Sequence, residues 1–545
     1  MTTVSEMGVS PTGLLSRERT IAGPNFNRWL VPPAALAIHL CIGMAYGFSV
    51  FWLPMSHLLA GTDAAACSAQ GLAAALTSAN CNWSVPTVTH IFEIFIAVLG
   101  ISAAIWGGWL EHAGPRKAGV IAAVCWGGGL VLLGGAVSMH QLWLVYLVAV
   151  FCGIGQGLGY ITPVSTLIKW FPDRRGMATG FAIMGYGGAA MIGAPLAVWL
   201  MNKFGATPAA GVARTLVALG IIYLIVMTAG AFGFRTAPPG WRPQGWSPAD
   251  AERSKALITQ RHVHLNRAWR TPQFWLIWGV LCLNVTAGIA VISMASPMFQ
   301  EIFGAKLVGL SASDVLTAAQ KASIAAAAAG LVGLISLFNS VGRIFWASLS
   351  DRIGRKNMYY TILVLGILLY CLLPTWGHLG IAALFVVSIC IILTMYGGGF
   401  STVPAYLADI FGTQMVGAIH GRLITAWSVA GVVGPALIAG LRQFQIDHGV
   451  AHALVYDITL YIMAGLLFIG LVCNFFVKPV DSKYWMSEAE LARERSLQRE
   501  DRVVANAELA ARGSFGIVGV LAWLAVGIPF LIGLYIALAK AAALF

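Results

Sequence analysis

The chain has 545 residues, of which 58% are hydrophobic and only 10% are charged, whereas an ordinary soluble domain carries about 25% charged residues. Its mean hydropathy of +0.80 excludes a water-soluble enzyme. The 62 glycines and 19 tryptophans are typical of a helical membrane protein with several spans. A net charge of +12 would suggest a nucleic-acid partner, but in a membrane protein such an excess more often marks the cytoplasmic loops.

Apolar segments divide almost the whole chain. A bilayer-spanning helix needs about 20 mostly apolar residues. Twelve such segments are predicted near 31–58, 88–110, 118–138, 142–168, 177–201, 212–233, 273–299, 323–347, 358–376, 379–406, 416–440 and 453–477. A thirteenth runs from 516 to 538. The polar leader 1–27 lacks a small-residue cleavage pattern, so the first segment reads as a retained helix rather than a signal peptide.

The basic residues are distributed unevenly between the two sides of the predicted membrane. Of the 33 Lys and Arg residues, 25 fall in the leader, in alternate loops, in the central segment and in the tail after the twelfth helix. Only 5 fall in the loops of the opposite side. Because basic loops stay in the cytoplasm, we expect both ends of the twelve-helix body to be cytoplasmic. The positive charge is therefore an orientation signal, and we expect no nucleic-acid partner.

The cysteines and the polar residues show no sign of an enzyme. Seven of the nine cysteines lie in apolar segments without metal-ligand spacing, where cysteine behaves as a small hydrophobic residue. The other two, Cys67 and Cys81, share the long first external loop, where they could pair on the oxidising side or remain free thiols. No nucleophile and base arrangement and no phosphate loop is present. The sequence thus predicts no catalytic residue, no metal and no cofactor.

An internal repeat relates the two parts of the chain at a constant spacing of 240 residues. Four matched pairs show it: Glu111 and Asp351, Gly114 and Gly354, Tyr160 and Phe400, and Pro195 and Pro435. The repeat predicts two six-helix halves in the same orientation. The predicted organisation is a cytoplasmic leader 1–27, a first half 28–233, a cytoplasmic central loop 234–272, a second half 273–478, a cytoplasmic amphipathic tail 479–513 and an extra apolar helix 514–545.

A short motif follows the second helix of each half. It has a Gly or Ala, an acid four residues later, a Gly three residues after the acid, and then a basic residue. Parallel halves with this motif resemble the major facilitator superfamily, which implies a substrate cavity between halves that rock against each other. The acid could latch against a neighbouring helix end, or the motif could be a topology signal alone. The candidate latch residues are Glu111, Arg116, Lys117, Asp351, Arg352, Arg355 and Lys356.

Ionisable side chains at membrane depth are candidates for function. Arg343 lies two turns before Asp351, about 12 Å deeper along the helix. Its counterpart in the first half is Ala103, so the arginine does not belong to the shared scaffold. A guanidinium binds a carboxylate through two parallel hydrogen bonds, and we expect Arg343 to hold a carboxylate substrate. The alternative is a structural arginine bonded to helix-end carbonyls or to Asp351.

Two further residues are candidates for proton coupling. Glu93 begins the second helix near the external face, where it could instead be solvated or act at a gate. His39 lies in the first helix and titrates in a suitable range. A lone histidine in a helix is more often a packed polar residue, and this alternative stays open.

Aromatic residues in glycine-rich helices form a second set of candidates. Small residues permit close helix contact, and the aromatic rings could wall a small cavity around the arginine or could simply pack in the core. Together with Asn339 beside Arg343, the substrate-binding candidates are Tyr46, Tyr160, Tyr186, Tyr396, Phe400 and Trp427.

The sequence resembles the oxalate/formate antiporter family, which is related to the monocarboxylate transporters, over residues 28–478. Three stretches carry the resemblance: GWLEHAGPRK at 108–117, YITPVSTLIKWFPDRRG at 160–176 and GRLITAWSVAGVVGP at 421–435. It implies that Arg343 is the helix 8 arginine that engages the substrate carboxylate. Two positions depart from these families. Trp427 replaces a second basic residue of the oxalate exchangers, and Asn339 replaces an acid of the proton-coupled carriers.

We therefore expect an all-α membrane protein of the major facilitator fold, most simply a monomer, in a bacterial-type inner membrane. It should transport small monocarboxylates such as lactate, pyruvate or formate by alternating access, through proton symport or exchange. One buried cation suits a monoanion. The alternatives are an oxalate/formate antiporter and a carboxylate sensor that does not transport. If the segment 514–545 spans the membrane, the C-terminus is external; it could instead form an accessory, re-entrant or surface helix.

Overall fold

The computed structural model describes residues 13–23, 26–55, 58–59, 76–78, 80–83, 85–205, 207–238, 241–243, 259, 261–310, 317–497 and 516–541. The described part is helical. Its β-type contacts are two isolated β-bridges, which pair Ile21 with Thr236 and Val263 with Trp485.

The first half begins with two short 3-10 turns, η1 (Glu18–Thr20) and η2 (Arg28–Leu30). Its helices are α1 (Val31–Ile42), η3 (Gly43–Phe51), α2 (Trp52–Met55), α5 (Val85–Ala113), α6 (Pro115–Ala123), η4 (Val124–Gly128), α7 (Gly129–Ser138), α8 (Leu142–Trp170), α9 (Arg175–Phe204) and α10 (Pro208–Gly233). Those of the second half are α12 (Leu265–Ala268), α13 (Pro272–Leu307), α14 (Ala318–Ile353), α15 (Arg355–Leu379), α16 (Ala382–Phe411), α17 (Val416–Leu423), α18 (Thr425–Asp447) and α19 (Asp457–Phe476). The tail adds η5 (Ser482–Tyr484), α20 (Glu488–Leu497) and α21 (Gly516–Ala541).

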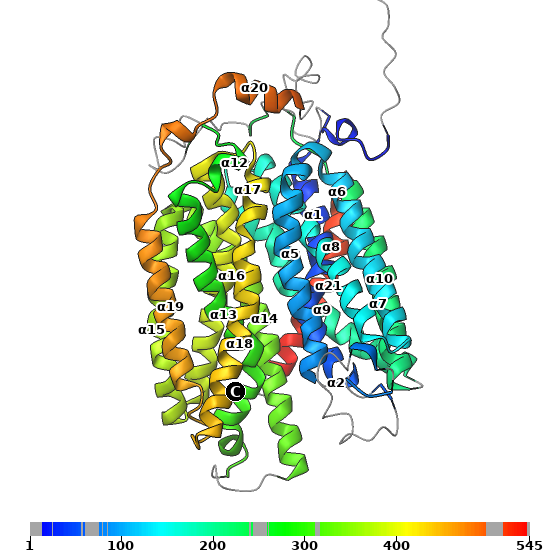
Figure 1. The fold of residues 1–545 in the computed structure, drawn as a ribbon, viewed down its shortest axis with the longest axis vertical. Coiled ribbons are helices and arrows are strands. Elements are labelled where there is room, and N and C mark those ends of the chain that lie inside the picture. Colours follow the sequence, from blue (N-terminus) through cyan, green and yellow to red (C-terminus); the bar gives the residue numbers. More distant parts are fainter. Residues whose placement is uncertain are drawn as a thin grey trace, which may run out of the picture.

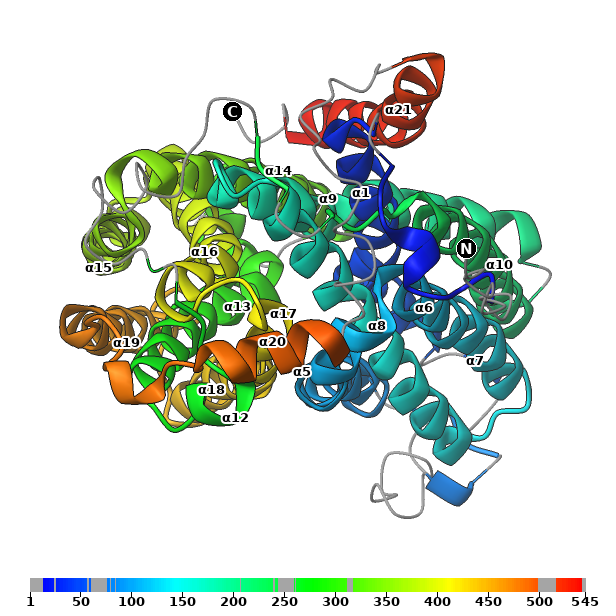
Figure 2. The ribbon, with the colours of Figure 1, turned by 90° about the horizontal axis from the view of Figure 1, so that it is seen from above.

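These helices form two bundles side by side (Figure 1). One contains α1 to α10 and the other α13 to α19, and α20 lies across one end of both (Figure 2). We call this the α20 end and the opposite one the far end. The bundles meet through α9 against α14 and through α5 against α17 and α18.

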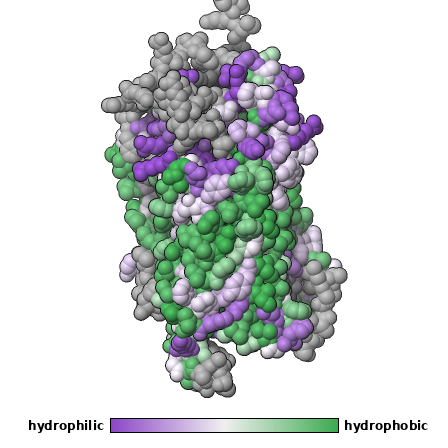
Figure 3. Space-filling view, turned by 90° about the vertical axis from the view of Figure 1, so that its left-hand side faces the viewer, coloured by the Kyte–Doolittle hydropathy of each residue, from purple (hydrophilic) through white to green (hydrophobic). Residues whose placement is uncertain are grey.

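Twelve helices in the described part are long and apolar enough to cross a membrane. They correspond to eleven of the predicted segments of the body and to α21. The one body helix outside this set is α14, which carries Arg343 and packs between α9 and α16. Apolar side chains cover the flank of the bundle, and hydrophilic ones gather at the α20 end (Figure 3). The all-α, multi-span prediction is confirmed.

The repeated glycines have a conformational role. Gly114 separates α5 from α6 with a φ of +83°, and Gly354 separates α14 from α15 with a φ of +88°. Side chains other than glycine rarely adopt this region. The chain therefore makes the same sharp turn at the same place in each half.

The first predicted span differs from a continuous helix. After α1 the chain tightens into the 3-10 segment η3 at Gly43. A Cβ atom on Gly43 would lie 2.4 Å from the main-chain oxygen of Tyr186. This close approach of α9 to the first helix brings Tyr46 toward Tyr186, with the two rings 5.1 Å apart.

The thirteenth segment forms the helix α21, which packs on α14, α9 and α1 and so contacts both bundles (Figure 2). The Trp523 indole donates a hydrogen bond of 3.1 Å to the carbonyl oxygen of Trp29. Its ring also lies 6.1 Å from that of Phe181. Of the predicted amphipathic stretch before it, α20 covers the first part, and residues 498–515 lie outside the described part.

Candidate functional site

Arg343 lies in α14 at the contact between the two bundles and is only 1% exposed. Its Nε donates to Oδ1 of Asn339 at 3.3 Å, and its Nη1 donates to the carbonyl oxygen of Ile183 at 3.4 Å. The guanidinium carbon lies 5.5 Å from the ring centre of Phe400. Among the ion pairs of the described residues, none includes Arg343, and Asp351 instead pairs with Arg355 at 2.7 Å. The charge of Arg343 is therefore held by neutral groups alone.

Glycines on the neighbouring helices make room for this side chain. A Cβ atom on Gly187 of α9 would lie 2.8 Å from Nε of Arg343. One on Gly397 of α16 would lie 3.1 Å from its Cγ. The glycine-rich runs of the sequence thus have a local purpose, which is to let a long cation sit between α9 and α16.

The six predicted aromatic residues lie in one cluster centred on Trp427. Its ring centre is 4.7 Å from that of Phe400, 5.2 Å from Tyr186, 5.5 Å from Tyr160 and 6.3 Å from Tyr46. These residues come from α18, α16, α9, α8 and η3, so the cluster draws on both halves.

The sixth aromatic residue joins the cluster through its hydroxyl group. The hydroxyls of Tyr396 and Tyr46 are 3.0 Å apart and hydrogen-bonded, which links α16 to η3 across the two halves. Tyr46, Tyr160, Tyr186 and Tyr396 all lie within electrostatic range of Arg343. We refer to Arg343, Asn339 and the six aromatic residues as the central cluster.

Several buried polar atoms in and beside the central cluster have no hydrogen-bond partner within the described part of the chain. They are the Tyr160 hydroxyl, the Trp427 Nε1, the Ser340 hydroxyl, the Gln156 Nε2 and the His420 Nδ1. A buried polar atom without a partner costs about 1–3 kcal/mol. The indole N–H of Trp427 can only donate a hydrogen bond. A bound acceptor such as a carboxylate would therefore satisfy it.

The two proton-coupling candidates lie in different surroundings. His39 of α1 is fully buried beside the central cluster, with its ring 5.3 Å from Tyr160 and 6.5 Å from Tyr186. Glu93 is 42% exposed and pairs with His90 one turn earlier at 2.9 Å. Its hydrogen bond and ion pair within the described part go to His90 and not to the central cluster.

The motif acid of the first half reaches the second half at the α20 end. Oε1 of Glu111 accepts a hydrogen bond of 3.0 Å from the main-chain N–H of Gly417, in the first turn of α17. Its other oxygen pairs with Lys169 at 2.7 Å. A carboxylate at a helix N-terminus is stabilised by the unpaired N–H groups there. This contact ties α5 to α17.

The motif acid of the second half makes the reciprocal contact. Asp351 accepts hydrogen bonds of 2.9 Å from the main-chain N–H groups of Gly176 and Met177, in the first turn of α9. Asp409 accepts bonds of 2.9 Å from Arg355 of its own half and from Arg175 of the other half. These contacts tie α14 and α16 to α9.

The four other candidate latch residues contact their own half or lie at the surface. Arg116 donates to the carbonyl oxygen of Leu14 in the leader, and Lys117 lies over the ring of Trp109. Lys356 donates to two carbonyl oxygens at the end of α19. Arg352 is exposed. Among the seven candidates, Glu111, Asp351 and Arg355 lie in the network between the halves.

The cysteine pair falls partly outside the described residues. Cys81 is disulfide-bonded. Cys67 lies outside the described part, so the pairing of these two residues stays a prediction. The seven cysteines of the apolar segments are free.

Sequence reasoning missed some polar residues of these networks. Lys169 and Asp409 lie 240 residues apart, so the repeat could have pointed to both positions. Lys169 pairs with the motif acid Glu111, and Asp409 pairs with Arg175 and Arg355. His420 and Gln156 sit beside the central cluster, and Tyr186 donates to the Gln156 side-chain oxygen at 3.2 Å. No sequence pattern indicated these two.

The family is decided by comparison with known proteins. The Major Facilitator Superfamily pattern matches residues 35–435, with a second match over 315–545. The chain belongs to the major facilitator superfamily. Among curated relatives, the oxalate:formate antiporter of Oxalobacter formigenes is 28% identical over 66% of this chain and 77% of its own length. Apicoplast pyruvate carrier 1 of Toxoplasma gondii is 26% identical over 53% of this chain and 60% of its own.

A further relative agrees with this assignment, and solved structures share the fold. Monocarboxylate transporter 12 of Rattus norvegicus is 25% identical over 61% of this chain and 65% of its own length. The proton:xylose symporter XylE has a TM-score of 0.55 at 12% identity, over 83% of this chain and 96% of its own. FucP in the outward conformation has a TM-score of 0.52 at 13% identity, over 83% and 100%. The protein is thus a multi-pass membrane transporter and not an enzyme.

Proposed function

We propose that this transporter carries small monocarboxylate anions, of the size of formate, lactate or pyruvate, by alternating access. The observation that supports this most is Arg343, a buried cation at the contact between the halves that has no acidic partner in the described part of the chain. A buried charge without a counter-charge is costly. A substrate carboxylate would supply that counter-charge, and the unpaired donors of Tyr160 and Trp427 would add hydrogen bonds.

The preference for a monoanion follows from the charge of the cluster. Arg343 is the only charged side chain among the eight residues of the central cluster. A dicarboxylate would bring a second negative charge into a site where Trp427 offers one neutral N–H group. The oxalate:formate antiporter and the monocarboxylate carriers among the relatives support a carboxylate substrate. An oxalate/formate exchanger is the second candidate.

The reciprocal helix-end contacts of Glu111 and Asp351 supply a mechanism for alternation. Both hold the two halves together at the α20 end, and both must break when the halves rock apart there. We propose that the α20 end is cytoplasmic because the basic loops gather on that side. The structure then corresponds to a transporter that is closed toward the cytoplasm.

Counterflow in proteoliposomes tests the substrate class. Liposomes loaded with unlabelled formate, lactate, pyruvate or oxalate are diluted into the labelled form of the same anion. We expect rapid uptake of at least one monocarboxylate and slow uptake of oxalate, relative to liposomes without protein. Counterflow of oxalate alone would favour the exchanger, and the absence of any carboxylate flux would contradict the proposal and favour a sensor.

A further inference from the structure

His39 stands out among the buried titratable residues because both of its ring nitrogens face acceptors. Nδ1 contacts the main-chain carbonyl oxygen of Ala182, and Nε2 lies 3.2 Å from the main-chain carbonyl oxygen of Tyr160. The side chain is fully buried in α1. A Cβ atom on Gly185 would lie 3.1 Å from the Cβ of His39, so α9 packs closely against the base of this side chain.

This geometry distinguishes the protonation states of the ring. A neutral imidazole carries one N–H donor and one nitrogen lone pair, whereas an imidazolium donates from both nitrogens. A carbonyl oxygen can only accept. With a neutral ring, one of the two contacts would set a lone pair against a lone pair. Only the protonated ring satisfies both Ala182 and Tyr160, so the two hydrogen-bond contacts favour the protonated form.

Charged and titratable groups from several elements surround this ring. Those that face His39 or interact with it are Tyr160 of α8, Tyr186 of α9, Arg343 of α14 and His420 of α17. The titratable and charged groups of the other elements that pack against α1 have different partners. Tyr46 of η3 bonds to Tyr396, Arg28 of η2 pairs with Asp173, and Tyr223 of α10 interacts with Cys41. Arg214 of α10 and Tyr535 of α21 are exposed at the surface. The described surroundings of His39 thus contain one fixed cation and no carboxylate.

Arg343 and His39 contact the main-chain carbonyl oxygens of two adjacent residues in α9. Arg343 donates to the carbonyl oxygen of Ile183, the residue after Ala182 in α9. A protonated His39 would therefore place a second positive charge beside Arg343 in an environment of low dielectric, where like charges repel strongly. A bound carboxylate would offset this repulsion. The proton and the carboxylate would then each favour the binding of the other, as linkage requires.

We propose that His39 is the proton-binding site of this transporter and that its proton and the substrate carboxylate bind cooperatively. This inference rests on the proposed function above. It assigns coupling to α1, since Asn339, which stands one turn before Arg343, cannot take up a proton. One proton and one monoanion would cross together, without net charge movement.

Proton uptake on carboxylate binding tests the inference directly. Purified protein in weakly buffered detergent solution near pH 6.5 receives sodium formate, sodium lactate or sodium pyruvate in separate titrations, and an indicator dye records the pH. We expect the wild type to take up about one proton per bound anion and His39→Gln to take up none. His448→Gln, which removes an exposed histidine, should behave as the wild type. Anion binding without proton uptake by the wild type would overturn the inference.

Transport under a proton gradient separates the two proposals. We expect an acidic outside to drive accumulation by the wild type and not by His39→Gln. Counterflow by the variant at equal pH should be slower than that of the wild type, because the proton that favours anion binding is missing, and it should no longer depend on that pH. Unchanged gradient-driven accumulation by His39→Gln would contradict the role of His39 alone, whereas a wild type without carboxylate counterflow would contradict the proposed function. If the variant does not fold, ¹⁵N-histidine spectra of the wild type replace it: one buried ring should become an imidazolium when the anion is added, and unchanged ring signals would overturn the inference.

Discussion

His39 of α1 and Arg343 of α14 contact consecutive main-chain carbonyl oxygens of α9, those of Ala182 and Ile183. The two side chains come from opposite halves of the chain, yet one stretch of α9 supports both. A change in the position of α9 relative to α14 must therefore alter the surroundings of both groups. This arrangement connects the rocking of the halves to the charges in the central cluster.

The close approach of Gly187 to Arg343 predicts a strong effect from a single methyl group. Gly187→Ala places a Cβ atom 2.8 Å from the Arg343 Nε, so the guanidinium must move. We expect about a tenfold rise in KM for the monocarboxylate, equivalent to ~1.4 kcal/mol. The matched control is Gly135→Ala in α7, where the added Cβ atom meets nothing within 4 Å. Equal KM values for the two variants would contradict this role of Gly187.

The reciprocal contacts of the motif acids predict local opening at two helix ends. Asp351→Asn weakens the bonds to the N–H groups of Gly176 and Met177, and Glu111→Gln weakens the bond to Gly417. Hydrogen bonds to charged groups contribute about 1.5–3 kcal/mol. We expect faster hydrogen exchange at the start of α9 in the first variant and at the start of α17 in the second.

Glu488→Gln is the control for these two variants, because the Glu488 side chain is 83% exposed and pairs only with the exposed Arg261 in the described part. Its exchange should match the wild type at both helix ends. If either motif variant also shows wild-type exchange at its own helix end, the latch interpretation is wrong for that half.

Glu301 at the far end predicts a loss of stability in acid. Burial raises its pKa, but hydrogen bonds from Arg442 and Tyr456 outweigh this and leave the pKa lowered from 4.5. A carboxyl group whose pKa is lowered by folding stabilises the fold at a pH above its pKa in the unfolded state. This contribution disappears as the pH falls through its pKa in the folded state. Below about pH 4.5 the wild type should therefore lose thermal stability faster than Glu301→Gln. Parallel melting curves of the two proteins from pH 6 to pH 3.5 would argue against this contribution.

His262 predicts a second acid-sensitive contact, at the α20 end. Burial and the nearby Arg495 and Arg175 lower its pKa from 6.5 to about 4. A histidine held neutral in the fold contributes stability above the unfolded pKa of 6.5, and this is lost as the pH falls toward 4. Hydrogen exchange of the segment around Val263 should rise over that interval in the wild type and stay level in His262→Gln. A level response in the wild type would exclude this contribution.

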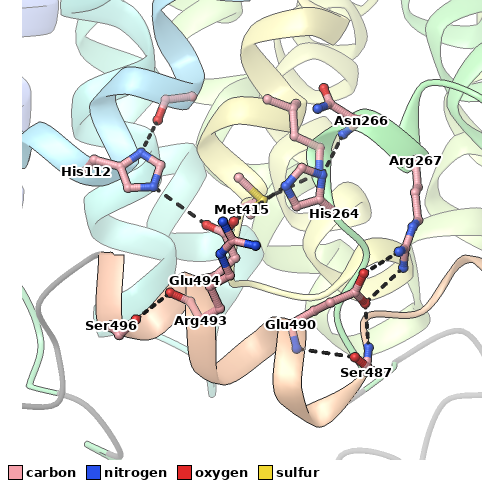
Figure 4. A network of polar contacts seen from close by, with 12 residues as sticks. His112, His264, Asn266, Arg267, Met415, Ser487, Glu490, Arg493, Glu494 and Ser496 are labelled. Carbon is pink, nitrogen blue, oxygen red and sulfur yellow. Dashed lines mark hydrogen bonds and ion pairs between the residues drawn. The ribbon is translucent and has the colours of Figure 1, made fainter.

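The same end carries a network that joins α20 to both halves (Figure 4). Glu494 lies 3.6 Å from His112 at the end of α5 and 3.6 Å from His264 before α12, and Glu490 pairs with Arg267. The pKa of Glu490 is lowered by its hydrogen bond from Arg267. α20 thus spans the junction that the motif acids close.

Much of this architecture was predictable from local chemistry. The lengths of the apolar segments were enough to locate the helices. The 240-residue repeat related Gly114 to Gly354, and the positive φ values of both glycines confirm that each half makes the same turn. The depth of Arg343 followed from its distance from Asp351, and its absence from the first half set it apart from the shared scaffold. These features depend on residue type and spacing alone, which a sequence displays directly.

Other features depend on how distant helices approach one another. The switch to a 3-10 helix occurs at Gly43, where α9 lies close to the chain, and the two carbonyl oxygens around His39 belong to α8 and α9. Main-chain acceptors leave no trace in the side-chain pattern. His39 could therefore be a candidate from its residue type, but its double acceptor geometry required the fold.

The substitution Trp427→Lys tests whether the single cation of the central cluster sets the preference for a monoanion. It adds a second cation within the central cluster, where the Trp427 ring now lies 4.7 Å from Phe400. Two cations suit two carboxylates, so we expect oxalate counterflow to rise and monocarboxylate counterflow to fall. Trp427→Phe separates the added charge from the lost indole, and it should not improve oxalate. An equal gain in both variants would contradict the charge argument.

Calorimetry of monocarboxylate binding to the purified protein measures whether Arg343 holds the substrate carboxylate. We expect Arg343→Gln to abolish monocarboxylate binding and Arg343→Lys to weaken it about tenfold, because lysine keeps the charge but not the two-pronged geometry. Arg214→Gln, which removes an exposed arginine on α10, should bind as the wild type. Wild-type affinity in a folded Arg343→Gln protein would contradict the account.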